Sequence, residues 1–422
     1  MKSIVLQCLK CFVLLLISTS CISQQSNVKV KNENNEFSLE VNGKPFFMTG
    51  MNWDYYPIGT NYKYNLWQQS ALTIKEALDY EMPLLKNIGV NTIRQNAVIP
   101  PEWIKYIYEN YGIYTVLNHT FGRYGLTLNG KWEANTDYSS PLVIETLLKE
   151  VDSLVFKYKN TPGLLMYLLG NENNYGLFWQ GAETENIPVE NRKSTIAAIH
   201  LYQLFNKAAI SMKAIDNNYP IAICNGDLMY LDIIAKECKD VDVLGVNIYR
   251  GLSFGDAFQR IKTVYNKPVM FTEFGADAFN EITKGEDQKD QANCLVENWK
   301  EVYANAAGCG KAANCIGGFT FQFSDGWWKS GQDINLYKHD STATWSNGGY
   351  KNDFQKGVNN MNEEWFGICA KGATNKNGVY KLYPREAYYA LKKVNKEYAG
   401  TILKKRDAVL KTKIKDVNTL AH

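Results

Sequence analysis

The chain has 422 residues and a formal net charge of +3 at pH 7, with 21% charged and 45% hydrophobic side chains. This length accommodates one large barrel or two to three smaller domains. Because the charge is nearly balanced and there is no basic stripe or nucleic-acid motif, a nucleic acid is not expected as a partner. Aromatic residues are plentiful, with 10 Trp, 27 Tyr and 18 Phe, which suits a large core as well as a cleft in which sugar rings stack on aromatic rings.

The N-terminus has the pattern of an export signal, predicted over residues 1–20. Its apolar run, Cys11–Ile17, is too short for an ordinary membrane-spanning helix. Small residues, Ser18–Ser20, precede Cys21 as in a relaxed bacterial lipobox. We therefore predict an exported protein. Lipidation of Cys21 would attach it to the bacterial outer membrane or cell surface, whereas cleavage a few residues later would release it to the periplasm or the medium.

The first mature residues are expected to contain little structure. Residues 21–36 are polar and rich in Asn and Gln, and we predict a flexible tether there. A short hairpin should follow, with Phe37–Val41 and Pro45–Met48 as its strands. The Asn42-Gly43 pair between these apolar runs is a strong hairpin signal, because both residues tolerate a positive φ.

From the hairpin onward, short apolar runs alternate with amphipathic stretches. The predicted strands are Phe47–Met51, Thr92–Arg94, Tyr114–Asn118, Leu164–Leu169, Ile221–Cys224, Val243–Asn247, Val269–Thr272 and Gly317–Gln322. The amphipathic stretches include Leu78–Ile88, Leu142–Tyr158, Ser194–Ile215 and Gln288–Asn305. Apolar strands of this kind are typical of parallel sheets buried on both faces. Eight of them with intervening helices predict an α/β fold, a single (β/α)8 TIM barrel over residues 37–400, followed by a frayed or disordered basic tail over residues 401–422.

Six cysteines lie beyond Cys21, and in an oxidising compartment one or two disulfides could form among them. Cys309 and Cys315 bracket a short loop and are the best candidate pair. No CxxC pair or cluster of His accompanies them, so a zinc site is not indicated. We expect neither a metal nor an organic cofactor.

A long segment, residues 323–380, separates the last predicted strand from the last helix. Long loops inside compact domains are usually functional or disordered. This one is too aromatic for simple disorder, with Trp327, Trp328, Trp345, Tyr350, Phe354 and Trp365. On a barrel it should lie over the carboxyl-terminal mouth.

Two of the predicted strands lead into a glutamate. Leu164–Leu169 runs on to Glu172, and Val269–Thr272 runs directly into Glu273. In chain order these are strands four and seven. Barrel enzymes place catalytic residues at carboxyl-terminal strand ends, and retaining glycosidases need two carboxylates about 5–5.5 Å apart. Either glutamate alone could simply cap a helix, but the two together predict a catalytic pair.

Two motifs carry a resemblance to a known clan. Gly170-Asn171-Glu172-Asn173 and Thr272-Glu273-Phe274-Gly275-Ala276 resemble the motifs of clan A glycoside hydrolases. Within that clan the chain is similar to the TIM-barrel domain of family 2 glycosidases and to fungal β-1,3-glucanosyltransferases. The resemblance implies that Glu172 is the general acid/base and Glu273 the nucleophile. The chain departs from both groups, because a hairpin stands where family 2 enzymes carry sandwich domains, and the glucanosyltransferases' anchor signal and cysteine pattern are not seen.

The resemblance also implies supporting roles at other strand ends. Asn171 would hydrogen-bond the 2-hydroxyl of the sugar. Arg94 after strand two and Tyr249 after strand six would contact the nucleophile, unless Arg94 pairs with a helix carboxylate and Tyr249 packs in the barrel rim. His119 follows strand three and would serve a sugar subsite or be a structural histidine.

Further polar and aromatic residues should reach sugar hydroxyls at the mouth. They are Asn52, Trp53 and Asp54 after strand one, and Asn225 and Asp227 after strand five. The resemblance also implies an aromatic floor for the sugar at the −1 position after strand eight. The candidates for that floor are Phe323, Trp327 and Trp328, of which Trp327 is favoured.

The sequence therefore predicts a retaining glycoside hydrolase that cleaves β-linked glycans, with an oligo- or polysaccharide as its partner. β-Glucan is favoured because of the glucanosyltransferase likeness and the aromatic content. A transglycosylase with the same residues is an alternative, since the first half-reaction is shared. A catalytically silent surface glycan-binding protein is a third, but its usual signature, the loss of one carboxylate, is missing.

Overall fold

The computed structural model describes residues 26–177, 193–346 and 359–399. The predicted signal peptide, the lipidation site Cys21 and the basic tail over residues 401–422 lie outside these ranges and stay predictions. Within the described ranges, no helix is both long and apolar enough to cross a membrane.

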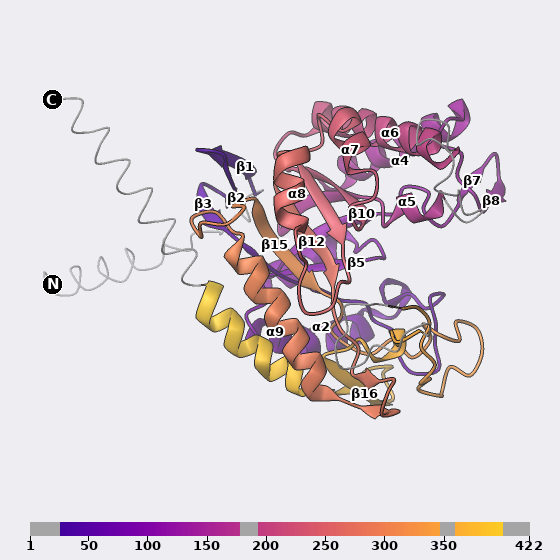
Figure 1. The fold of residues 1–422 in the computed structure, drawn as a ribbon. Coiled ribbons are helices and arrows are strands. Elements are labelled where there is room, and N and C mark those ends of the chain that lie inside the picture. The colour runs from indigo at the N-terminus through magenta and orange to yellow at the C-terminus, as the bar shows by residue number, and fades with distance from the viewer. Residues whose placement is uncertain (1–25, 178–192, 347–358, 400–422) are drawn as a thin grey trace, which may run out of the picture.

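A closed barrel of eight parallel strands forms the centre of the molecule (Figure 1). Its strands in chain order are β4 (Met48–Asn52), β5 (Thr92–Gln95), β6 (Tyr114–His119), β9 (Leu164–Leu169), β10 (Ile221–Gly226), β11 (Val243–Asn247), β12 (Val269–Phe274) and β15 (Cys315–Thr320). Each strand pairs with the next, and β15 closes the barrel on β4. The predicted (β/α)8 fold is confirmed, and the strand ends differ from expectation by at most two residues.

Helices surround the barrel (Figure 1). They are α2 (Ala71–Asn87), α3 (Pro101–Tyr111), α4 (Pro141–Tyr158), α5 (Asn173–Gly176), α6 (Lys193–Ile215), α7 (Leu231–Glu237), α8 (Ala257–Val264), α9 (Gln288–Ala304) and a last helix over residues 386–399. Helix α2 begins where the Ser70 hydroxyl accepts a hydrogen bond from the backbone N–H of Thr73. Its buried side chains recur at helical spacing, as in Ile74, Leu78, Met82 and Leu85. One apolar face therefore packs on the barrel.

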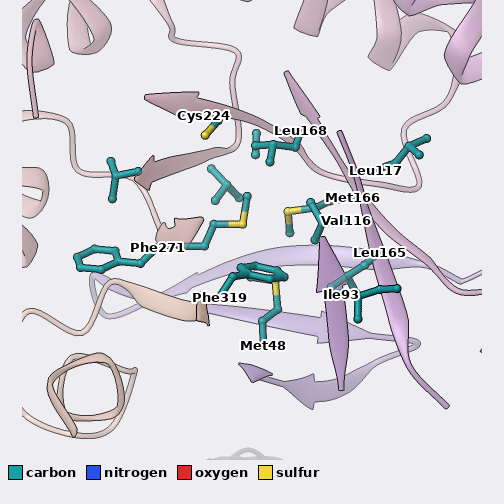
Figure 2. Packing of buried hydrophobic residues seen from close by; sticks show 14 of the residues in the cluster. Met48, Ile93, Val116, Leu117, Leu165, Met166, Leu168, Cys224, Phe271 and Phe319 are labelled. Carbon is teal, nitrogen blue, oxygen red and sulfur yellow. The ribbon is translucent and has the colours of Figure 1, made fainter. Parts of the chain in front are cut away.

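Side chains fill the interior of the barrel. Figure 2 shows Met48, Met166 and Phe319, which come from three different strands, among the buried residues between the strands. Gly50 on β4 leaves room for the Phe319 ring, because a Cβ at residue 50 would lie 2.4 Å from the ring. The barrel is thus a packed core, and a ligand can bind only at its ends.

A three-stranded antiparallel sheet precedes the barrel. It consists of β1 (Val28–Glu33), β2 (Glu36–Val41) and β3 (Lys44–Phe46). The predicted hairpin is its second half, and Asn42 and Gly43 have positive φ angles of 51° and 73°. The predicted tether is wrong from residue 28 onward, because β1 pairs with β2 along its whole length and Val28 is 1% exposed. Val28 N–H also donates to Asn218 O, just before β10, so the sheet lies at the amino-terminal end of the barrel.

The predicted disulfide between Cys309 and Cys315 is not formed, and both residues carry thiols. Cys315 begins β15 and is buried, with its thiol 3.5 Å from the carbonyl oxygen of Gly317. Backbone hydrogen bonds close the loop instead, from Cys309 N–H to Ala306 O and from Cys315 N–H to Asn305 O. The ends of the loop are therefore held together without a covalent link.

The described parts of the segment after β15, up to residue 346 and from residue 359, lie over the carboxyl ends of the strands, as predicted. They include η3 (Glu363–Trp365), β16 (Cys369–Thr374) and β17 (Tyr380–Pro384). The other short elements of the chain are η1 (Leu66–Gln68), β7 (Leu126–Leu128), β8 (Lys131–Glu133), β13 (Phe279–Asn280) and β14 (Gly285–Glu286). Phe323 N–H donates to Asn52 O at the end of β4. Arg385 pairs with Asp325 at 2.7 Å, and both side chains are almost inaccessible. Because breaking a buried ion pair is costly, this pair holds the start of the segment to its end.

Candidate active site

One cavity of about 990 Å³ opens at the carboxyl ends of the barrel strands. Its lining includes Asn96, Arg123, Tyr124, Asn171, Glu172, Tyr175, Asp227, Asn247, Tyr249, Glu273, Phe321, Trp328, Lys329, Trp345, Glu363 and Phe366. These residues come from the ends of several strands and from the segment after β15. Both glutamates predicted from the sequence thus face the same space, which is large enough for a sugar ligand.

Glu172 stands at a sharp turn between β9 and α5. The turn needs left-handed backbone at two residues, with φ of 82° at Gly170 and 57° at Glu172. Glu172 Oε1 accepts a hydrogen bond of 3.0 Å from Asn247 Nδ2. Desolvation by the surrounding protein and, next, the Glu273 carboxylate raise the pKa of Glu172 to about 7. The side chain can therefore carry a proton near neutral pH.

Glu273 lies within β12 and is held at both carboxylate oxygens. Arg94 Nη1 donates to its Oε1 at 2.6 Å, and the Tyr249 hydroxyl donates to its Oε2 at 3.0 Å. Arg94 is completely buried, so this ion pair is shielded from solvent. The structure thus brings Arg94 and Tyr249 to the second glutamate, where the resemblance places them.

Asn171 connects the residue that binds Glu273 with the residue that binds Glu172. Its Oδ1 accepts from Arg94 Nη2 at 2.8 Å and from Asn247 Nδ2 at 3.1 Å. Its Nδ2 donates to the Tyr124 hydroxyl at 2.8 Å, and its backbone carbonyl accepts from Arg123 Nε at 3.1 Å. The amide is therefore oriented from all sides while it still lines the cavity.

Two predicted residues, Trp53 and His119, point away from the cavity. Trp53 is buried outside the barrel and donates from Nε1 to Glu81 of α2 at 2.6 Å. His119 accepts from Phe121 N–H and lies 3.5 Å from a carboxylate oxygen of Glu150 on α4. Successive residues of a strand face opposite sides, so the residue before each one points inward. Those neighbours bind Arg94: Asn52 accepts from it at 2.9 Å and Asn118 at 3.4 Å.

Three other polar residues were predicted at the mouth of the barrel, and they differ in whether they line the cavity. Asp227 lines the cavity and pairs with Arg250 at 2.5 Å. Asn225 does not line it, because its Oδ1 accepts from the Tyr202 hydroxyl on the helix side. Asp54 is buried, and its carboxylate accepts a long hydrogen bond, 3.4 Å, from the backbone of Asn96. Only Asp227 of these three is placed to touch a ligand.

The aromatic lining differs from expectation. Trp327 stacks on His339 with ring centroids 4.7 Å apart and does not line the cavity, so its predicted role as a floor is wrong. Trp345 and Trp328 line the cavity instead. The Trp345 ring lies 5.2 Å from Tyr249 and stacks on Phe366 at 6.3 Å. Tyr350 and Phe354 lie outside the described residues.

Sequence reasoning did not single out Asn247, although it donates to Glu172 and Asn171 and lines the cavity. It lies two residues before Tyr249, so the two-residue period of a strand could have found it. Tyr124 comes from a loop with no such period. Among the described residues, no three His, Cys, Asp or Glu side chains are grouped to hold a metal ion.

A closed parallel barrel with two glutamates facing one cavity at the carboxyl ends of its strands is the architecture of a TIM-barrel glycosidase. The chain belongs to glycosyl hydrolases family 2, whose TIM barrel domain matches residues 28–333. The predicted resemblance to this family is therefore confirmed.

Individual known proteins are also similar to this chain. The 1,3-beta-glucanosyltransferase GAS4 of Saccharomyces cerevisiae is 25% identical over 290 residues, which cover 63% of this chain and 55% of that protein. A family 2 β-galacturonidase from Eisenbergiella tayi has a TM-score of 0.53 at 15% identity, covering 88% of this chain and 54% of the other. ScGas2 has a TM-score of 0.51 at 19% identity, covering 87% and 69%. The chain spans about half the length of the first two, and the solved structures show a shared fold.

Proposed function

We propose that this protein is a retaining glycosidase that cleaves β-linked glycans, with Glu273 as nucleophile and Glu172 as general acid/base. One observation carries the proposal. Two glutamates share a cavity but have different partners, a cation and a phenol for Glu273 and an amide for Glu172. Such a difference in surroundings is what separates the roles of two carboxylates in one site.

In the first step, a carboxylate oxygen of Glu273 attacks the anomeric carbon. The bond from that carbon to the leaving oxygen breaks, and Glu172 gives its proton to that oxygen. A covalent glycosyl ester with inverted configuration results. In the second step Glu172 takes a proton from water, whose oxygen attacks the anomeric carbon and releases Glu273. Two inversions restore the original configuration.

The neighbours of the two glutamates serve these steps. Arg94 and Tyr249 hold the carboxylate of Glu273 at both oxygens, so the attacking atom is oriented before substrate binds. Asn171 keeps its amide at the cavity wall, where it can bind the 2-hydroxyl of the sugar. Trp345 and Trp328 offer apolar surface to sugar rings.

β-Glucan is the favoured substrate, since the yeast relative is named for 1,3-β-glucan and the cavity is partly aromatic. Transglycosylation needs no other residues, because a sugar hydroxyl can replace water in the second step. Silent glycan binding is less favoured, since both carboxylates are present in the cavity.

The proposal is tested with a panel of β-linked oligosaccharides and aryl β-glycosides. Proton NMR of the first product should show the β anomer forming before mutarotation. A longer oligosaccharide among the products would assign transglycosylation. If the α anomer forms first, the double-displacement mechanism is wrong; if no β-glycoside is cleaved, the activity is wrong.

The pH dependence of kcat/KM should follow the proton on Glu172. Because the pKa of this side chain is raised to about 7, the acid form predominates below that pH and is lost above it. For substrates with poor leaving groups, kcat/KM should therefore fall about tenfold per pH unit well above pH 7. Initial rates from pH 5 to 9 provide the measurement, and a flat profile across pH 6 to 9 would contradict the assignment of Glu172 as acid.

A further inference from the structure

Asn247 is the last residue of β11, and its buried amide lies against the acid/base. Its Nδ2 donates to Glu172 Oε1 at 3.0 Å and to Asn171 Oδ1 at 3.1 Å. Both N–H groups of this amide thus have an acceptor in the site. Asn247 is 2% exposed, so its amide is largely shielded from bulk water.

Side chains of the two neighbouring strands lie at the oxygen of the Asn247 amide. The Thr272 hydroxyl donates to Asn247 Oδ1 at 2.7 Å, and the Cys224 thiol lies 3.3 Å from it. Thr272 belongs to β12 and Cys224 to β10, the two strands that flank β11. A carboxamide has one acceptor end and one donor end. Asn171 Oδ1 can only accept, and so can Glu172 Oε1 when the carboxyl is ionised, so the N–H groups of Asn247 face them and its oxygen faces Thr272 and Cys224.

We propose that Asn247 is a positioning residue for Glu172, and that the Thr272 hydroxyl and the Cys224 thiol hold the oxygen of its amide in place. This inference rests on the proposed function for the role of Glu172. A donated hydrogen bond stabilises the ionised form of a carboxyl group, which the surrounding protein and Glu273 disfavour. Asn247 thus keeps Glu172 able to lose its proton to the leaving group and take one from water.

Other groups also act on this carboxyl and must stay unchanged in a test. Glu273 raises its pKa, whereas Arg123 and Arg94 lower it. Further titratable side chains with an electrostatic interaction with Glu172 are Tyr124, Tyr175, Cys224 and Tyr249. A substitution that reaches Glu172 only through Asn247 is therefore the cleanest probe.

Thr272→Val is such a substitution, because it is nearly isosteric and removes only the hydroxyl donor. The amide oxygen then loses its strongest donor, so the amide is held less firmly and its hydrogen bond to the ionised Glu172 weakens, which favours the protonated carboxyl. The alkaline limb of kcat/KM should move up by about half a pH unit, and kcat should fall several-fold. Asn247→Asp, which removes the donor itself, should move the limb up by about one unit.

The matched control is Thr115→Val. Thr115 lies on β6 of the same barrel, and its buried hydroxyl has no hydrogen-bond partner among the described residues. This variant should keep the limb and kcat of the wild type. Thermal unfolding followed by circular dichroism will show whether all three variants are folded.

A second readout does not depend on activity. Carboxyl ¹³C NMR, with the Glu172 resonance assigned by Glu172→Gln, should show its titration shifted upward in Thr272→Val and Asn247→Asp. An unshifted titration in both folded variants, or an equal shift in Thr115→Val, would overturn the inference. A wild-type protein that cleaves no β-glycoside would overturn the proposed function instead, while the titration still decides whether Asn247 acts on the carboxyl.

Discussion

Glu273→Gln should abolish turnover of every β-glycoside that the wild-type protein cleaves, with a loss of kcat on the order of 10⁵-fold. The variant keeps the size of the side chain but replaces the attacking oxygen with a neutral amide, so the glycosyl ester cannot form. The loss should be the same for good and poor leaving groups, because both pass through the same attack. Initial rates on an activated aryl β-glycoside give the most sensitive measurement.

The variant should still fold, since the Gln oxygen can accept the hydrogen bond from Arg94. Some stability will be lost, because the Arg94 charge stays buried without its counter-charge. Circular dichroism and the melting temperature separate this effect from catalysis. Glu297→Gln is the control for the chemical change, since Glu297 is half exposed on α9 and pairs only with Lys300 among the described residues. Near-wild-type rates in folded Glu273→Gln would sink the nucleophile assignment.

The barrel could be predicted because its strands are buried on both faces. Runs such as Leu164–Leu169 and Val269–Thr272 are mostly apolar, and the structure buries every residue of β9 and β12. The signal at β1 is weaker, since only Val28 and Val30 are apolar among polar neighbours. Its strand depends on pairing with β2, which composition alone does not reveal.

The site could be predicted only in part, because a strand end shows the location of a residue but not its direction. Arg94, Tyr249 and both glutamates point inward, whereas Trp53 and His119 are one residue out of phase and point to the helices. Counting in steps of two from a residue known to face inward would have selected their neighbours. The loop after β15 has no two-residue period from which the inward-facing residues could be counted. The sequence therefore favours Trp327, whereas Trp345 and Trp328 line the cavity.

Glu172→Ala should separate substrates by their leaving groups. A poor leaving group must receive a proton as the bond breaks, so kcat/KM on an unactivated β-linked oligosaccharide should fall about 10³-fold. A dinitrophenolate leaves without that proton, and kcat/KM for its glycoside should fall less than about tenfold. The second step loses its base for both substrates, so the glycosyl ester on Glu273 should accumulate and give a burst of dinitrophenol.

Azide discriminates this role from a merely structural one. The space left by the carboxylate can admit an anion that attacks the glycosyl ester without a base, releasing Glu273 and forming a β-glycosyl azide. Azide should therefore speed turnover of the activated glycoside by Glu172→Ala and leave the wild type unchanged. Equal losses on both leaving-group classes, with no burst and no azide product, would assign the proton transfer to another residue. Asn247 is bound to the Glu172 carboxylate, so the unactivated oligosaccharide and the dinitrophenyl glycoside also show which step is impaired in the Asn247 variant. An effect confined to poor leaving groups would mean that Asn247 acts on the proton that Glu172 donates.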